Sequence, residues 1–79
     1  MAVAVKLPEI SMGVTEATIV RWLKAVGDRI EAGEPLVEVE TAKSTVEVEA
    51  PASGVLTEIL VQPDEEVEVG SHIAKIGQD

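Results

Sequence analysis

The sequence contains no cysteine, one histidine and a single residue of the Phe, Tyr and Trp group, Trp22. Without cysteine the chain has neither a disulfide framework nor thiol chemistry of its own. His72 has no second histidine or cysteine beside which to build a metal site or a catalytic triad, so we expect neither. The sequence also lacks a glycine-rich phosphate loop and an apolar run of membrane-spanning length. These absences leave few residues from which a nucleophile and a general base could be paired, so a stand-alone enzyme is the function we expect least.

Basic residues are scarce as well. Six Lys and Arg stand against 15 Asp and Glu, which gives a formal net charge of −9. Nucleic acids and anionic membranes both attract basic surfaces, so we expect neither as a partner. A docking partner should instead be basic. No secretory or transit segment precedes Val3, and we expect the cytoplasm, or the mitochondrial matrix if the source is eukaryotic.

The chain of 79 residues predicts a single domain made of strands. Its apolar residues, 46% of the total, are mostly Val, Ile, Leu and Ala, and the β-branched share favours strands. No segment keeps a helical period. Turn residues at close spacing separate short strands and predict an all-β sandwich or flattened barrel. The strands are expected at 3–7, 17–23, 35–40, 45–50, 55–61, 66–68 and 73–76, with a further short strand from 29 that ends by Gly33.

The sequence contains an internal repeat, with copies at about 3–40 and 46–77. A shift of 37 residues places Ile19 on Leu56 and Gly33 on Gly70, and a shift of 43 places residues 7–8 on 50–51. The two shifts differ by six, so the first copy carries about six extra residues near 9–13. Two copies of one motif usually pack about a pseudo-twofold axis.

The most regular stretch consists of two Val-Glu arms on either side of residues 42–43. A period of two predicts strands with valines on one face and glutamates on the other. If residues 42–43 are the centre of the turn, Val39 lies opposite Val46 and Val37 opposite Val48. A slip of one residue would set valine against glutamate, so the register is well specified.

Lys43 therefore occupies the tip of a predicted hairpin. Ala42-Lys43 offers neither Asn nor Gly for the positive φ of the commonest hairpin turns, so a type I turn or a longer loop is expected. A tip lysine is ordinarily just a solvated residue. Here the matched arms, and the presence of only four lysines, favour Lys43 as a point of covalent attachment. A shift of Lys43 by one repeat reaches residue 6 or passes residue 79, which predicts that it lies opposite the chain ends.

Three stretches together resemble the lipoyl domains of the acyltransferase component of 2-oxo acid dehydrogenase complexes. They are residues 7–10 (LPEI), 16–28 (EATIVRWLKAVGD) and 39–44 (VETAKS). The resemblance covers essentially all of residues 1–79. It implies a flattened barrel of two four-stranded antiparallel sheets with internal twofold symmetry. It also implies lipoic acid as the cofactor, linked through an amide bond to Lys43.

The resemblance further implies a carrier that catalyses no step itself, within a dihydrolipoyllysine-residue acyltransferase. In that family the lipoyl group is reductively acylated by a thiamine-diphosphate dehydrogenase, passes its acyl group to the acyltransferase core and is reoxidised by a flavin dihydrolipoamide dehydrogenase. A lipoate-protein ligase attaches it. The cofactor supplies the chemistry, while the protein positions the arm and raises its effective concentration. We expect the isolated domain to be a monomer.

Recognition by these partners is expected at the turn and at the loop with the extra residues. The candidates are Glu40, Thr41, Ala42, Ser44 and Glu47 at the hairpin, and Glu9, Ile10, Ser11, Met12 and Gly13 in the loop. The family usually has Asp where this chain has Ala42, and Ala is common where it has Ser44. The alternative for the loop is an ordinary surface connection.

Other functions remain open from the sequence. A biotin carrier domain shares the architecture, but that family typically has methionine on both sides of its lysine, where this chain has Ala42 and Ser44. A glycine-cleavage carrier is longer than 79 residues. A β-sandwich adaptor that carries no covalent group is the alternative of another class.

Overall fold

The computed structural model describes residues 2–10 and 12–78, which form strands joined by turns and loops. None of these residues forms a helix, so the described chain has no helix that could cross a membrane. The strands are β1 (Ala2–Lys6), β2 (Glu16–Trp22), β3 (Arg29–Ile30), β4 (Pro35–Glu40), β5 (Thr45–Glu49), β6 (Gly54–Ile59), β7 (Glu66–Glu68) and β8 (His72–Gly77).

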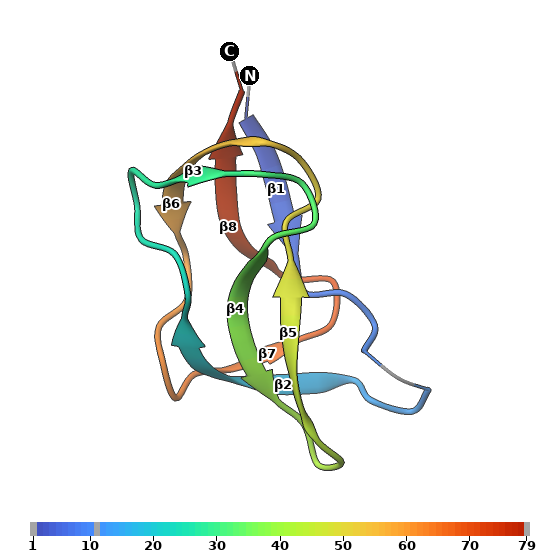
Figure 1. The fold of residues 1–79 in the computed structure, drawn as a ribbon. Coiled ribbons are helices and arrows are strands. Elements are labelled where there is room, and N and C mark those ends of the chain that lie inside the picture. Colours follow the sequence, from blue (N-terminus) through green and yellow to red (C-terminus); the bar gives the residue numbers. More distant parts are fainter. Residues whose placement is uncertain (1, 11, 79) are drawn as a thin grey trace.

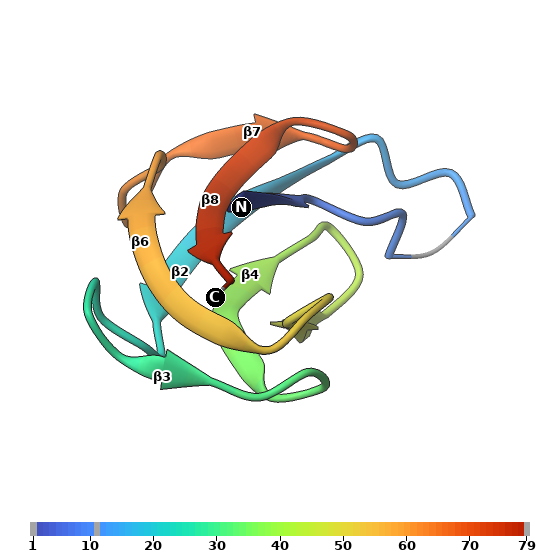
Figure 2. The ribbon, with the colours of Figure 1, turned by 90° about the horizontal axis from the view of Figure 1, so that it is seen from above.

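Two open four-stranded sheets make up the fold, with strand orders β1-β8-β6-β3 and β5-β4-β2-β7. Every pairing between neighbouring strands is antiparallel. The expected all-β architecture of two four-stranded sheets is confirmed. The β4–β5 hairpin projects from the end of the molecule opposite both termini (Figure 1). The loop between β1 and β2 extends sideways from the body in both views (Figure 2).

The pseudo-twofold symmetry expected from the repeat extends to the backbone hydrogen bonds. The bounds of β8 are those of β4 shifted by 37 residues, and the bounds of β5 are those of β1 shifted by 43. The amide of Gly27 donates to the carbonyl of Leu56 at 2.7 Å, and the equivalent amide of Asp64 donates to Ile19 at 2.7 Å. Both Gly27 and Asp64 have positive φ, 99° and 71°. The two halves therefore form their turns in the same way.

Symmetry breaks at the β1–β2 loop. This loop runs over 7–15, whereas its counterpart between β5 and β6 runs only over 50–53. The extra residues predicted near 9–13 lie within it. Most strand ends differ from expectation by one or two residues. The strand β6 was expected to reach Val61 and ends at Ile59, and β3, expected to continue to residues 32–33, ends at Ile30. Val61 is nevertheless buried, because apolar residues continue into the core beyond the ladder.

The core between the sheets is entirely aliphatic. Alternate positions on the long strands point inward, since successive side chains of a strand lie on opposite faces. The half-buried Trp22 packs against this core, and its indole Nε1–H donates to the carbonyl of Val61 at 2.9 Å. The buried residues are Val5, Leu7, Ala17, Ile19, Ile30, Leu36, Val37, Val39, Val48, Ala50, Leu56, Val61, Val67, Ile73, Ala74 and Ile76.

Gly54 lies where β6 passes close to the end of β8. A Cβ built at Gly54 would press on the carbonyl oxygen of Gly77, a backbone atom that cannot move aside. We expect Gly54→Ala to reduce the free energy of unfolding by about 1–3 kcal/mol, measured by urea denaturation. A Cβ at Gly77 would press on the Thr57 methyl group, at 2.8 Å, and would lie at ordinary contact distance, 3.9 Å, from the carbonyl oxygen of Val55. Gly77→Ala should therefore cost less, and equal costs would contradict this assignment of the close contact.

Glu34 lies between β3 and β4, and its carboxyl accepts contacts that lower its pKa. The backbone N–H of Glu31 donates to Glu34 Oε1 at 2.7 Å, and Lys24 Nζ lies 3.2 Å from Oε2. The bond from Glu31, followed by the contact with Lys24, holds the pKa of the exposed Glu34 carboxyl below its ordinary value of 4.5.

A lowered carboxyl pKa stabilises the fold only while the group is ionised. This contribution is complete above the unfolded-state pKa and disappears as the pH falls through the folded-state value. We expect Glu34→Gln to lower Tm at neutral pH, and the difference from wild type to vanish as the pH falls well below 4.5. Thermal melts of both proteins across this range measure it, and a difference independent of pH would be inconsistent with the assignment.

Candidate functional site

The β4–β5 hairpin has the register expected from its valines. Val37 pairs with Val48, and Val39 with Val46. Val37, Val39 and Val48 are buried, whereas the glutamates on the opposite face are exposed or half-buried. Burial of Val37, Val39 and Val48 anchors the hairpin to the core. The turn between the two strands is therefore held at a defined place relative to the core.

The turn itself spans Thr41 to Ser44, with Ala42 and Lys43 at its centre. The backbone N–H of Thr41 donates to the carbonyl of Ser44 at 2.8 Å. Among the non-glycine residues that the structure describes, positive φ occurs only at Asp64. Ala42 and Lys43 therefore avoid the left-handed backbone of the commonest hairpin turns, as their identities predict. The Thr41 side chain supplies further hydrogen bonds, to the backbone of Lys43 and Ser44.

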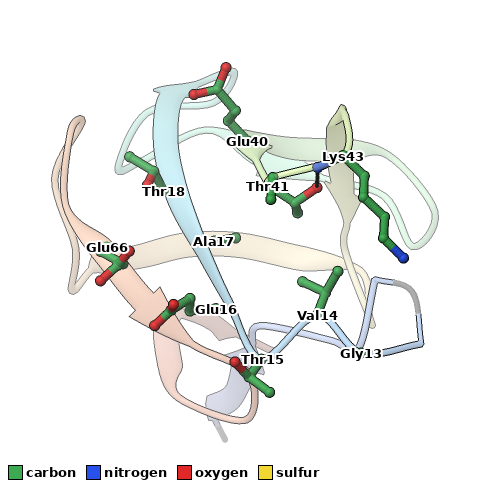
Figure 3. Close-up of a pocket in the computed structure, with 11 residues that line it drawn as sticks. Gly13, Val14, Thr15, Glu16, Ala17, Thr18, Glu40, Thr41, Lys43 and Glu66 are labelled. Atoms are coloured by element: carbon green, nitrogen blue, oxygen red, sulfur yellow. Dashed lines mark hydrogen bonds between the residues drawn. The ribbon is translucent and has the colours of Figure 1, made fainter.

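Lys43 is exposed in the turn between β4 and β5, and this hairpin projects from the end of the molecule away from the termini (Figure 1). Its side chain is directed away from Glu16 and Glu66 and towards the β1–β2 loop (Figure 3). Nζ lies 3.4 Å from the carbonyl oxygen of Met12, a long hydrogen bond. The long loop and the lysine turn are thus neighbours in space, although they are 31 residues apart in sequence.

A shallow cavity of about 400 Å³ separates the turn from the start of β2 (Figure 3). Of the residues singled out from the sequence, the structure places five around it, namely Gly13, Glu40, Thr41, Ala42 and Lys43. The remaining candidates lie outside its lining. Glu9, Ser44 and Glu47 are exposed, Ile10 is half-buried against the core, and Met12 is 89% exposed. Ser11 lies outside the described residues.

The rest of the lining was not anticipated from the sequence. It consists of Val14, Thr15, Glu16, Ala17, Thr18 and Glu66. Thr18 of β2 pairs with Glu40 on one side and with Glu66 on the other, which brings β7 to the site. The repeat relates β2 to β6 and β7 to β3. The pairing of β2 with β7 is therefore the symmetry equivalent of the pairing of β6 with β3.

The electrostatic character of the cavity is acidic. Glu16, Glu40 and Glu66 line it, and none of them forms an ion pair with any residue in the described part of the chain. Lys43 is the one basic residue in the lining described here. Within residues 2–10 and 12–78, no group of three or more His, Cys, Asp or Glu side chains could hold a metal ion. Lys43 thus presents an exposed amine at the edge of an acidic cavity.

The family model Biotin_lipoyl, described as "Biotin-requiring enzyme", matches residues 3–76. The chain therefore belongs to this family.

Among curated proteins, the relatives are acyltransferase components. The dihydrolipoyllysine-residue acetyltransferase component of the Corynebacterium glutamicum pyruvate dehydrogenase complex is 50% identical over 76 residues, which cover 96% of this chain and 11% of that protein. The succinyltransferase component of the Staphylococcus saprophyticus 2-oxoglutarate dehydrogenase complex is 49% identical over 74 residues, or 94% of this chain and 18% of that protein. The chain thus spans less than a fifth of these relatives.

Solved structures give the same fold. The lipoyl domain of the Azotobacter vinelandii 2-oxoglutarate dehydrogenase complex superposes with a TM-score of 0.75 at 29% identity, covering 96% of each chain. The Kluyveromyces lactis urea carboxylase gives 0.83 at 27% identity, covering 98% of this chain and 6% of that one. With the curated relatives, the match to the Azotobacter vinelandii domain confirms the resemblance to lipoyl domains.

Gly13, whose φ is 84°, directly follows Met12, whose carbonyl contacts Lys43. Gly13→Ala has space for its Cβ but must leave or strain this backbone conformation, at a cost of about 1 kcal/mol. We expect the NMR signals of Met12 and Lys43 to shift with it. Gly33→Ala is the matched control, since its φ is 90° and its Cβ also has space. Gly33→Ala should lower the free energy of unfolding by a similar amount without shifting the NMR signals of Lys43. Shifted Lys43 signals in both variants would contradict a specific contact between the loop and Lys43.

Proposed function

We propose that Lys43 carries lipoic acid in amide linkage, and that residues 1–79 form one non-catalytic carrier unit of a dihydrolipoyllysine-residue acyltransferase. The observation that carries this proposal is the exposed lysine at the tip of a paired hairpin, which projects from the end opposite the chain termini. The identities of about 50% with acyltransferase components support lipoic acid as the attached group.

The residues around Lys43 suit such a modification. Its amine is exposed, and among the described residues no carboxylate forms an ion pair with it. Its polar contact is with the Met12 carbonyl, at 3.4 Å. Conversion of the amine to an amide leaves one N–H on Nζ, so this contact can persist after attachment.

The attached group would supply what the chain lacks. When bound, lipoic acid contributes a disulfide that can take up an acyl group together with two electrons, whereas the protein has no cysteine. The protein itself would hold the attachment point at Lys43 exposed to solvent, with the chain termini at the opposite end of the domain. Attachment to a longer chain at the opposite end would raise the effective concentration of the arm at each active site.

The partners we propose follow from this role. They are a thiamine-diphosphate 2-oxo acid dehydrogenase, the acyltransferase core, a flavin dihydrolipoamide dehydrogenase and a lipoate-protein ligase, in the cytoplasm or the mitochondrial matrix. A net charge of −9, and three cavity carboxylates that form no ion pair within the described residues, favour basic docking surfaces on these partners. The glutamates near the turn and the β1–β2 loop are the surface that we propose they contact.

Biotin is the second candidate for the attached group. The TM-score of 0.83 with a urea carboxylase, and the description of the matching family as biotin-requiring, favour it. Against it stand Ala42 and Ser44, which replace the methionines typical of biotin carriers. The two candidates make the same demand on Lys43 and differ in the ligase that should recognise the turn.

Incubation with lipoate-protein ligase or with biotin ligase, followed by intact mass, distinguishes them. We expect the mass of one lipoyl group to be added and no biotin. Lys43→Arg should abolish the addition, because an arginine cannot form the amide. Lys6→Ala and Lys75→Ala, in the sheet that does not carry the turn, are the controls and should be modified fully. Addition of biotin would establish the second candidate, and no addition by either ligase would favour an unmodified adaptor.

A further inference from the structure

The side-chain hydroxyl of Thr41 is the centre of the hydrogen bonding within the lysine turn. Thr41 Oγ1 accepts the backbone N–H of Lys43 at 3.2 Å and that of Ser44 at 3.1 Å. The same hydroxyl donates to the carbonyl of Ser44 at 2.9 Å. A hydroxyl has one proton to donate and two lone pairs to accept with. All three are used inside the turn, which leaves nothing to offer a docking partner.

These bonds replace what the central residues of the turn cannot supply. Tight turns usually rely on Gly, Asn or Asp at the positions occupied here by Ala42 and Lys43. Neither residue has a side chain that folds back onto the backbone of the turn. Thr41, one position earlier, does so instead in the manner of a Ser/Thr turn, bridging to residues two and three positions further on.

The amide held by this hydroxyl is that of the lysine itself (Figure 3). The Lys43 side chain is long, flexible and exposed, so its root is placed only by the backbone at residue 43. One of the two bonds that Oγ1 accepts fixes that backbone directly, and the other fixes the next residue. Beyond the last strand pair, Glu40–Thr45, the Thr41 hydroxyl and the Thr41–Ser44 backbone bond together hold the tip.

We propose that Thr41 is a positioning residue for modification of Lys43, acting through the turn and not through contact with the partner; this rests on the lipoyl function proposed above. Loss of the hydroxyl leaves the hairpin paired but allows the tip several conformations. A ligase that needs one of them then encounters a smaller competent fraction, and its apparent affinity falls in proportion. The effect should appear as a higher KM for the domain, with kcat retained at saturation.

The test compares Thr41→Val, which replaces the hydroxyl by a methyl group of similar shape, with Thr41→Ser, which keeps it. Thr45→Val makes the same chemical change at an exposed threonine on the adjoining strand, whose hydroxyl takes no part in the turn. Initial rates of lipoyl transfer by lipoate-protein ligase are measured against domain concentration. Amide hydrogen exchange at Lys43 and Ser44, and Tm, are measured on the same samples.

We expect Thr41→Val to lower kcat/KM about tenfold through KM, as the loss of one or two hydrogen bonds would. Exchange at the amides of Lys43 and Ser44 should become faster. Thr41→Ser and Thr45→Val should match wild type in both readouts. Thr41→Ala is a second variant that lacks the hydroxyl and should behave like Thr41→Val.

The proposal would be overturned by modification of Thr41→Val at the wild-type rate, by a failure of Thr41→Ser to restore modification, or by an equal loss in Thr45→Val. A lower Tm for Thr41→Val with unchanged transfer kinetics would show a purely structural role and would also overturn it. If wild type itself accepts no lipoyl group, the proposed function is wrong, whereas unchanged exchange at Lys43 and Ser44 in Thr41→Val would show separately that the hydroxyl does not hold the turn.

Discussion

The pairing of two valine-lined strands is the interaction on which the rest of this structure depends. Val37 with Val48 and Val39 with Val46 fix how β4 lies against β5. Burial of Val37, Val39 and Val48 between the sheets makes any other register costly, because a slip by one residue would carry glutamates inward. The place of the turn follows from that register, and the place of Lys43 follows from the turn. A small aliphatic core thus determines where a single amine stands in solvent.

Much of this was predictable from the sequence because the relevant signals are local. Period-two alternation in residues 37–49 gave the hairpin and its register, and the 37-residue repeat gave the symmetry and the position of Lys43 opposite the termini. Proline and glycine marked most strand boundaries to within one or two residues. The end of β6 was placed too late, since Leu60 and Val61 continue the apolar pattern after pairing with β8 has ended.

The parts that escaped prediction depend on contacts between distant segments or on single atoms. Thr15 to Thr18 and Glu66 reach the site only through the pairing of β2 with β7. The approach of the Met12 carbonyl to Lys43 depends on the path of a loop, for which side-chain patterns carry no signal. The sequence singled out Thr41 as a candidate for recognition but did not indicate that its hydroxyl is engaged within the turn. A threonine hydroxyl can hydrogen-bond either to a partner protein or to the nearby backbone, and the sequence alone does not distinguish these two uses.

The symmetry of the sandwich is complete in its strands but not in its connections. Where one half closes its outer pair of strands with the lysine turn, the other half leaves the corresponding strands, β1 and β8, unjoined as the two ends of the chain (Figure 1). The two ends of the symmetric sandwich therefore differ, since one end carries the lysine turn and the other carries both termini. The lipoyl group that we propose on Lys43 would therefore stand at the end of the domain opposite to the one where both termini lie.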